Sequence, residues 1–315
     1  MTDLKIDKSD KIYVAGHNGM VGSALVRGLQ KRGYSNLLMR TRKELDLLDQ
    51  DSVFSFLQKE KPRYIFLAAA KVGGINANNT FRGQFIYENL AIETNIIHGA
   101  HLAGIKELNF LGSSCIYPRD CPQPMKEEYL LTGPLEPTNE PYAISKIAGI
   151  KMCESYNRQY STQYVSSMPT NLYGPNDNYD LNTSHVLPAL ICKAHKAKVS
   201  GDKQLIVWGS GKPMREFLYV DDAADALIYM MEKKLTEGIF NIGTGEEVTI
   251  RELAETVMTV VGFQGEITFD ASKPDGTPRK LLSVEKLRKL GWQAQTKLKE
   301  GIGKAYQDFL ETHEN

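Results

Sequence analysis

Tyr142 and Lys146, together with the segment from Ser113 to Cys115 upstream of them, are the residues of this chain best suited to moving protons. A phenol and an ammonium four positions apart share one face of a helix, so the cation can lower the pKa of the phenol from its ordinary value of about 10. Such a pair exchanges a proton with a carbonyl or alcohol group. The same spacing is also typical of a solvated helix face, so this interpretation depends on the rest of the chain.

A glycine-rich turn near the start of the chain favours the chemical interpretation. The apolar run 12–15 is typical of a buried strand, and helical periodicity begins at residue 23. Between them, Gly16 permits a tight turn, Gly19 lets the backbone approach a pyrophosphate, and Gly22 lets the helix pack closely on the sheet. The G-x-x-G-x-x-G spacing predicts a nicotinamide dinucleotide site made by Gly16, His17, Asn18, Gly19, Met20, Val21 and Gly22.

Two arginines follow the second expected strand, residues 37–39, where an acidic residue would bind the ribose hydroxyls of NAD. A guanidinium suits the additional phosphate of NADP, because it forms paired, charge-assisted hydrogen bonds with phosphate oxygens. Arg40 and Arg42 therefore predict NADP(H) as the cofactor. Asp46 and Asp49 either cover the adenine or cap the helix expected to begin near Asp51.

The composition limits the classes of function. The chain has 315 residues and equal numbers of basic and acidic side chains, 38 each, so we expect neither a nucleic-acid nor a membrane partner. It has no apolar run of membrane-spanning length and a polar N-terminus without signal-peptide character. The four cysteines have neither metal-binding spacing nor a dense disulfide pattern. We expect a cytoplasmic protein without a bound metal.

Strand-like and helical segments alternate along the first half of the chain. The expected strands are 12–15, 37–39, 64–69, 108–111 and 164–168, and the clearest helices are 85–102 and 142–160. This alternation predicts an α/β fold, a Rossmann-like doubly wound parallel sheet. The turn-rich stretch 169–184 leaves the sheet, and residues 238–243 are expected to return to it. We therefore predict a cofactor domain of residues 1–172 and 217–244, and a smaller, discontinuous α/β substrate lobe of residues 173–216 and 245–315.

The chain resembles the extended short-chain dehydrogenase/reductase family, whose members act on nucleotide sugars. The resemblance lies in the order along the chain of the glycine turn, Ser113 or Ser114, Tyr142 and Lys146. Longer motifs are similar to the 3,5-epimerase-4-reductases of this family: residues 111–118, 136–143, 168–175, 208–211, 213–217 and 273–280. The resemblance covers about residues 11–310. It implies conversion of GDP-4-keto-6-deoxy-D-mannose to GDP-L-fucose, by epimerisation at carbons 3 and 5 and reduction of carbon 4 with NADPH.

The resemblance also implies roles for individual residues. Inversion beside a keto group needs proton carriers on opposite faces of the sugar, and these would be Cys115 as base and His185 as acid. Ser113 would bind the carbonyl oxygen, Tyr142 would donate the proton, and Lys146 would lower the pKa of Tyr142 and bind the nicotinamide ribose. The residues alone leave Ser113 and Ser114 as alternatives. The implied cofactor contacts beyond the turn are Arg40, Arg42, Leu111, Gly112, Ser113, Ser114, Lys146, Pro169, Thr170, Asn171, Leu172 and His185.

A nucleotide-sugar diphosphate requires cations, and Arg215 is the best candidate. The resemblance adds Lys193 near the diphosphate, Trp208 near the guanine and Asp275 as a hydrogen-bond acceptor. It also implies a homodimer formed through the two long helices. Asn18 stands where some members of the family carry an arginine, which leaves Arg40 and Arg42 to bind the NADP phosphate.

Two other functions compete with the epimerase-reductase. The first is a nucleotide-sugar 4-epimerase or dehydratase, which would retain its cofactor through the reaction. A dehydratase would also carry an acidic pair beside Ser114, where this chain has Cys115. A protein that only senses NADP would have no need for proton carriers. The combination of Tyr142, Lys146, Cys115 and His185 favours the epimerase-reductase.

Overall fold

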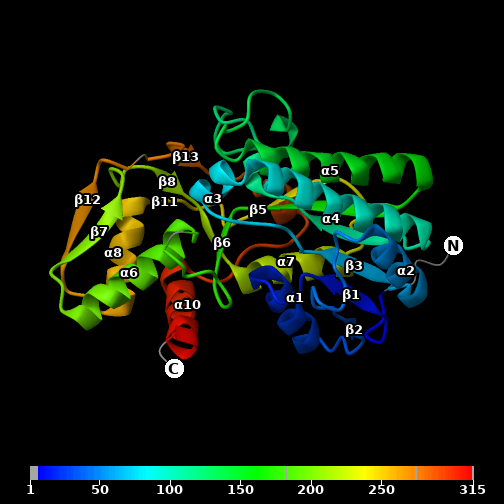
Figure 1. The fold of residues 1–315 in the computed structure, drawn as a ribbon, viewed down its shortest axis with the longest axis horizontal. Helices are drawn as coiled ribbons and strands as arrows, with labels where there is room; N and C mark the ends of the chain where they lie inside the picture. The colour runs from blue at the N-terminus through cyan, green and yellow to red at the C-terminus, as the bar shows by residue number, and fades with distance from the viewer. Residues whose placement is uncertain (1–5, 182, 274, 314–315) are drawn as a thin grey trace.

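A six-stranded parallel sheet forms the centre of the computed structural model, which describes residues 6–181, 183–273 and 275–313 (Figure 1). The strands lie in the order β10-β5-β4-β3-β1-β2, and each pairs with its neighbours in parallel. Their bounds are Ile12–Ala15 (β1), Leu37–Leu38 (β2), Tyr64–Leu67 (β3), Glu107–Leu111 (β4), Gln163–Pro169 (β5) and Ile239–Ile242 (β10). The predicted doubly wound sheet is confirmed, including the return of residues 238–243 to its edge.

Two layers of helices cover the faces of this sheet. Strand side chains alternate between the faces, so Tyr13 and Ala15 lie in one core while Ile12 and Val14 lie in the other. The helices of the first layer are α2 (Gln50–Glu60), α4 (Arg82–Leu102) and α5 (Glu140–Tyr160), and those of the second are α1 (Met20–Lys31) and α7 (Val220–Glu232). The short α3 (Ile75–Thr80) precedes α4. In Figure 1, α4 and α5 lie side by side, as the two long helices expected from the sequence.

Asp49 is the N-cap of α2. Its carboxylate accepts hydrogen bonds from the backbone N of Ser52, at 3.3 Å, and from the Ser52 hydroxyl, at 2.7 Å. The side chain thereby satisfies a backbone donor at the start of the helix. Of the two roles that the sequence left open for Asp49, the structure shows the capping role.

Smaller sheets and three helices form the second part of the molecule, at the left of Figure 1, around a third core. The helices are α6 (Val186–Ser200), α8 (Ile250–Val261) and α10 (Leu298–His313). β7 (Gln204–Trp208) pairs with β12 (Glu266–Asp270), β8 (Met214–Arg215) lies between β11 (Val248–Thr249) and β13 (Arg279–Lys280), and β6 (Asn171–Tyr173) pairs with β9 (Phe217–Tyr219). The exact domain boundaries stay a prediction.

The segment from Leu282 to Trp292 differs from the predicted division, which placed residues 245–315 in the substrate lobe. Leu282 and Val284 pack in the first core of the large sheet, while Leu287, on α9 (Glu285–Lys289), and Trp292 pack in the second. These apolar side chains are buried against the cofactor domain. The chain therefore crosses from the second part to the large sheet and back before α10 begins.

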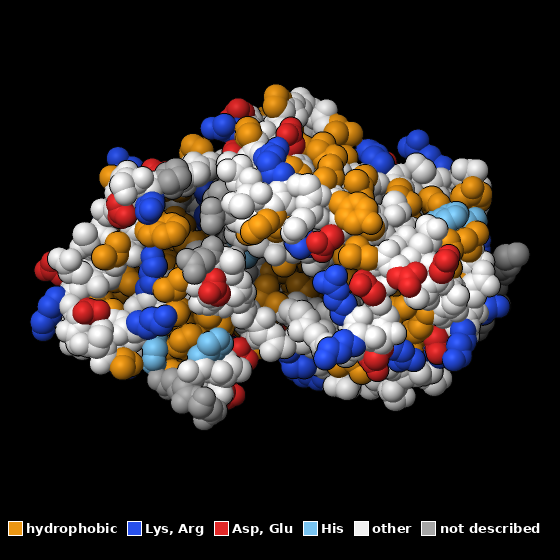
Figure 2. Space-filling view, viewed as in Figure 1, with side chains coloured by type: hydrophobic (Ala, Val, Ile, Leu, Met, Phe, Trp, Pro, Cys, Tyr) orange, Lys and Arg blue, Asp and Glu red, His pale blue; other side chains and the backbone are white. Residues whose placement is uncertain are grey.

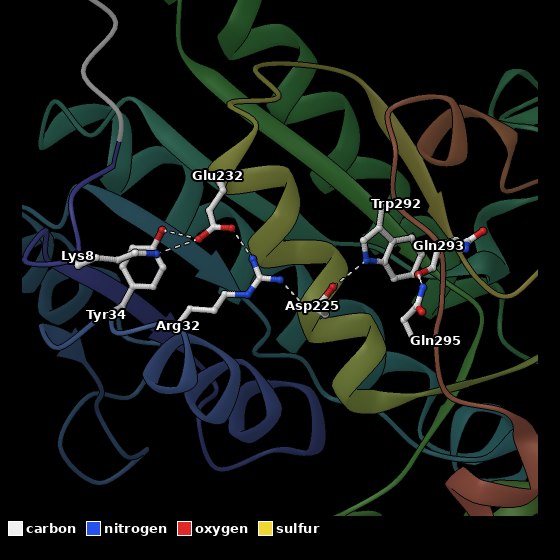
Figure 3. Close-up of polar contacts among 8 residues, drawn as sticks. All are labelled: Lys8, Arg32, Tyr34, Asp225, Glu232, Trp292, Gln293 and Gln295. Atoms are coloured by element: carbon white, nitrogen blue, oxygen red, sulfur yellow. Dashed lines mark hydrogen bonds and ion pairs between the residues drawn. The ribbon is translucent and has the colours of Figure 1, made fainter.

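A polar network holds this returning segment in place (Figure 3). The indole N–H of Trp292 donates a hydrogen bond to Asp225 at 3.0 Å. Arg32, which follows α1, forms ion pairs with both Asp225 and Glu232 of α7. Glu232 also pairs with the ammonium of Lys8 at 3.0 Å. The network thus joins α1, α7 and the segment that follows α9.

Glu216, between β8 and β9, connects three segments that are distant in sequence. Its fully buried carboxylate accepts hydrogen bonds from the backbone N of Thr244, Gly245 and Leu282, at 2.7, 2.8 and 2.9 Å. Its backbone carbonyl accepts from the side chain of Asn171 at 2.7 Å. Burial raises the pKa of Glu216, and the backbone hydrogen bonds act against this by favouring the charged form.

We predict that Glu216→Gln destabilises the protein by about 2 kcal/mol, because the amide nitrogen cannot accept and leaves a buried backbone N–H unpaired. The measurement is the free energy of unfolding in urea. Glu255→Gln, at an exposed position on α8, is the matched control and should stay within about 0.5 kcal/mol of wild type. A Glu216→Gln protein as stable as the control would show that the three hydrogen bonds contribute little.

Candidate active site

The glycine turn has the geometry that its spacing predicts. Gly16 has a φ of +86°, and a Cβ atom on it would lie 2.7 Å from the backbone N of Ala69. A Cβ on Gly22 would lie 2.1 Å from the carbonyl oxygen of Gly16, so the first turn of α1 rests directly on the loop. α1 begins at Met20 without an acidic residue in its first turn. The helix N-terminus therefore offers backbone donors and a positive dipole end to an anion.

Arg40 and Arg42 lie just beyond β2, at the same edge of the sheet. Arg40 lies over the ring of Phe56, 5.4 Å from its centre, and is 3.7 Å from the carboxylate of Glu60. Arg42 is exposed, and its guanidinium is 3.7 Å from Asp46. Arg40 donates to the carbonyl of Met39 at 2.7 Å. The distances to Glu60 and Asp46 exceed normal hydrogen-bond lengths, so both guanidinium groups retain other donors for a phosphate.

Nearby, the ring Nδ1 atom of His17 is buried and has no hydrogen-bond partner among the described residues. The turn, this orphaned polar atom and the two arginines fit a dinucleotide phosphate.

The loops after β4 and β5 bring further predicted residues to this edge. Gly112 donates to the carbonyl of Ser167 at 2.9 Å, and a Cβ on it would lie 2.4 Å from the sulfur of Met168. Leu111 and Ser114 are buried beside it. Pro169 ends β5, and β6 begins at Asn171 and includes Leu172. Between them, the backbone N of Thr170 donates to the carbonyl of Ile242 at 3.0 Å, which fixes the loop against β10.

Lys146 is fully buried on α5, and four groups surround its ammonium. Its ammonium donates to the carbonyl oxygen of Leu111 at 2.9 Å and lies 3.0 Å from the carboxylate of Glu93 on α4. It also lies 4.8 Å from the ring centre of Phe110 and 5.7 Å from that of Tyr142. The position of the lysine is thus set by β4 and α4 as well as by its own helix.

Tyr142 is a protonated phenol in this setting. Burial raises its pKa well above the ordinary value, and the charges of Cys115 and Glu93 raise it further. The lowering of this pKa by Lys146 stays a prediction, and in this structure the ammonium is paired with Glu93. Tyr142 is therefore suited to donating a proton at neutral pH.

Ser113 and Cys115 lie at the start of a short 3-10 helix, Ser114–Ile116. The hydroxyl of Ser113 accepts a hydrogen bond from the backbone N of Cys115 at 3.3 Å. Ser114 is buried, whereas Ser113 retains access to solvent. Accessibility therefore favours Ser113 over Ser114 as the hydroxyl that contacts a substrate.

Cys115 and His185 share a neighbouring cation, Lys280. Burial raises the pKa of the Cys115 thiol, and the charge of Lys280 is the largest effect that opposes this rise. His185 precedes α6 and keeps solvent access, yet surrounding protein and the charge of Lys280 lower its pKa. Desolvation in turn lowers the pKa of Lys280, and the charge of Cys115 counteracts it. The structure thus brings the two predicted proton carriers within the field of one lysine.

Trp208 and Lys193 form one half of the predicted substrate site. Trp208 ends β7 with 56% of its surface exposed, and two ammonium groups lie over its ring, that of Lys193 at 4.8 Å and that of Lys273 at 5.3 Å. An exposed indole is suited to stacking on a planar base. The two cations beside it suit a diphosphate.

Asp275 and Arg215 form the other half. The carboxylate of Asp275 accepts from the backbone N of Ser210 at 2.6 Å and from its hydroxyl at 2.8 Å, two residues after Trp208. Burial lowers the pKa of Arg215, and the charge of Asp275 opposes this. Arg215 donates to the carbonyl of Met214 at 2.8 Å and is partly buried on β8.

Glu93, Lys273 and Lys280 are site residues that the sequence does not predict individually. Lys273 and Lys280 lie in the motif 273–280, from which the resemblance implies a role only for Asp275. Glu93 gives a weaker signal, as one of two acidic residues in a mainly apolar helical run. Only packing shows that its carboxylate lies against Lys146.

Among the residues that the structure describes, no group of His, Cys, Asp and Glu side chains is arranged to hold a metal ion. The helices within the described ranges include none that is long and apolar enough to span a membrane.

The fold and the site define a dinucleotide-dependent enzyme with a Tyr-x-x-x-Lys pair. The chain matches the model of the NAD dependent epimerase/dehydratase family over residues 12–243. It is 56% identical over 304 residues to GDP-L-fucose synthase 1 of Arabidopsis thaliana, covering 96% of this chain and 94% of that protein. It is 55% identical over 313 residues to GDP-L-fucose synthase of Escherichia coli (strain K12), covering 96% and 98%.

Among solved structures, a GDP-L-fucose synthetase from Naegleria fowleri bound to NADP is similar, with a TM-score of 0.92 at 32% identity, covering 99% of this chain and 96% of that chain. The chain therefore belongs to the NAD dependent epimerase/dehydratase family.

We predict that replacing both Arg40 and Arg42 by Met weakens the binding of NADPH by about 10- to 100-fold, because charge-assisted hydrogen bonds to the additional phosphate are lost. Binding of NADH, which lacks that phosphate, should change by less than about threefold. Titration of cofactor fluorescence measures both affinities. Arg158→Met, at an exposed position on α5, is the control. Equal weakening for the two cofactors would contradict the assignment of these arginines.

Proposed function

We propose that this protein is an NADP-dependent enzyme that converts GDP-4-keto-6-deoxy-D-mannose to GDP-L-fucose, by epimerising carbons 3 and 5 and reducing carbon 4. The observation that carries this proposal is the grouping of a reduction pair, Tyr142 and Lys146, with two further proton carriers, Cys115 and His185. A dehydratase would need an acidic pair beside Ser114, and a sensor would need none of these groups. The relatives named GDP-L-fucose synthase support the same substrate.

NADP(H) fits the glycine turn, where Gly16, Gly19 and Gly22 would hold the pyrophosphate and Arg40 and Arg42 the additional phosphate. When bound, the cofactor supplies a hydride to carbon 4 of the sugar. The predicted contacts of the loops after β4 and β5, and of His185 and Lys146, belong to this proposal. The GDP part would lie on Trp208, Lys193, Arg215 and Asp275.

Epimerisation requires a base and an acid on opposite faces of the sugar. Cys115 would remove the proton beside the keto group, and the charge of Lys280 favours the thiolate that does so. His185 would return a proton to the other face. The enolate that forms between these steps carries negative charge on the keto oxygen. Ser113 and Tyr142 would stabilise that oxygen by hydrogen bonds.

Reduction uses the same oxygen, which becomes an alkoxide as hydride arrives at carbon 4. Tyr142 would protonate it, and its raised pKa keeps the phenol in the protonated form until then. Ser113 would hold the oxygen by a hydrogen bond, and Lys146 would stabilise the Tyr142 phenolate that remains. One pocket therefore serves all three steps, because both kinds of step place charge on one oxygen.

The proposed setting is the cytoplasm, whose reducing conditions suit the four cysteines, all free thiols in the structure. We also propose a homodimer that forms through α4 and α5. Tyr87, on α4, and Ile144, on α5, are 66% and 41% exposed, and the rings of His101 and Tyr160 stack at 4.0 Å between the two helices. A light-scattering mass of one 35.3 kDa chain, where twice that mass is expected, would exclude the dimer.

The experiment that tests the function supplies freshly made GDP-4-keto-6-deoxy-D-mannose with NADPH. We expect NADPH oxidation and a product identified as GDP-L-fucose by NMR. With the corresponding UDP sugar, NADPH should be oxidised much more slowly, because its base differs from guanine. Failure to form GDP-L-fucose, or equal rates with the two nucleotides, would reject the proposal.

We predict that Cys115→Ser abolishes incorporation of solvent deuterium at carbons 3 and 5 while NADPH still binds, because a hydroxyl is a much weaker acid than a thiol. In the wild type, burial raises the pKa of Cys115, so exchange should increase with pH as the thiolate forms. Lys280→Met should move this increase to higher pH, because the opposing cation is gone. Mass spectrometry measures the exchange. Unchanged exchange in Cys115→Ser would remove Cys115 from the mechanism.

A further inference from the structure

Glu93 is a buried acid that none of the steps above uses. It lies in the middle of α4 with 1% of its surface exposed. Neither of its carboxylate oxygens has a hydrogen-bond partner among the described residues, and the ion pair with Lys146, at 3.0 Å, is the contact that compensates its charge. Burying a charge without hydrogen bonds is costly, and apolar side chains would fill the same space at no loss of stability. Stability alone therefore does not account for this residue.

The packing of α5 places its backbone directly against this carboxylate. A Cβ atom on Gly149 would lie 2.9 Å from a carboxylate oxygen of Glu93 and 2.4 Å from the ring of Phe110. Because Gly149 has no side chain, α5 can lie close to Glu93 on α4. Lys146, one turn earlier on α5, then lies over Phe110 and against Glu93. With the carbonyl of Leu111, these groups confine the ammonium to one position.

We propose that Glu93 is a positioning residue for the reduction at carbon 4, which holds the ammonium of Lys146 in place beneath Tyr142. This inference rests on the proposed function. Glu93 touches neither the sugar nor the cofactor in this scheme, and it acts only through Lys146. The epimerase half of the reaction, in which Cys115 and His185 carry the protons and Tyr142 only donates a hydrogen bond, depends on it much less.

The electrostatics agree with this geometry. Burial raises the pKa of Glu93 to about 7, and Lys146 acts against the rise. Tyr142 and Cys153, also on α5, both have pKa values that Glu93 raises further. Among the described residues, Lys146, Tyr142 and Cys153 are the titratable side chains coupled to Glu93. Its charge therefore also keeps the phenol protonated before the proton is donated.

The test compares Glu93→Gln with wild type in two readouts, the single-turnover rate of NADPH oxidation and deuterium incorporation at carbons 3 and 5. We expect oxidation to slow by about 10- to 100-fold at pH 7, and the deficit to grow as pH rises from 6 to 9. Below pH 7 the buried carboxyl of the wild type is itself mostly protonated, so the two proteins differ most at high pH, where Glu93 carries its charge. Deuterium incorporation should stay within about threefold of wild type.

Two further variants make the test specific. Glu93→Asp keeps the charge but retracts it by one methylene, so it should slow oxidation only about three- to tenfold. Glu154→Gln removes an exposed carboxylate that pairs with Lys151 on α5, and it should match wild type. If Glu93→Gln does not fold, the Asp variant alone decides, and oxidation at the wild-type rate in that variant overturns the inference.

Other outcomes overturn the inference as well. If Glu93→Gln oxidises NADPH at the wild-type rate with an unchanged pH profile, the reduction does not depend on the carboxylate of Glu93. Equal losses of oxidation and deuterium incorporation, not restored by Asp, indicate a purely structural role. A wild-type protein that performs neither reaction overturns the proposed function, and this inference with it.

Discussion

Glu216 fixes the relative positions of three segments, and both halves of the candidate site depend on where these segments lie. Its carboxylate binds the backbone after β10 and the start of the segment that returns to the large sheet, while its carbonyl holds Asn171 at the cofactor edge. Arg215, its neighbour on β8, is the proposed contact of the diphosphate. One buried charge, stabilised by backbone N–H groups, thus joins the place where a dinucleotide would bind to the place where a sugar nucleotide would bind.

Burial has opposite consequences for the acids and the bases of this site. It raises the pKa values of Tyr142 and Cys115 and lowers those of His185 and Lys280, so each group is biased towards its neutral form. Neutral groups are the correct starting state for a phenol that donates a proton. Cys115 can accept a proton only as a thiolate, and a nearby cation favours that form. Lys280 is the cation that opposes the effect of burial on its pKa.

Much of the fold and part of the site could be predicted from the sequence. Strand and helix periodicity is local, and Gly16 and Gly22 are required by close backbone approach, so the glycine turn is visible as a pattern. The pairing of Lys146 with Glu93 could not be predicted, because it depends on how closely α5 packs on α4. The position of Trp292 in the second core could not be predicted either. It depends on the return of the segment from Leu282 to Trp292 to the large sheet, which has no local sequence pattern. Proximity between distant segments is a property of packing.

The chain contains two tryptophans, and their surroundings differ strongly. Trp208 is 56% exposed with two ammonium groups over its ring, whereas Trp292 is 5% exposed in a hydrophobic core. Indole emission shifts to longer wavelength in water, so the two side chains report separately on one spectrum. A guanine stacked on Trp208 would quench only the red part of the emission. Under the proposed function, the protein would therefore carry an intrinsic optical reporter of nucleotide binding, with its own internal reference.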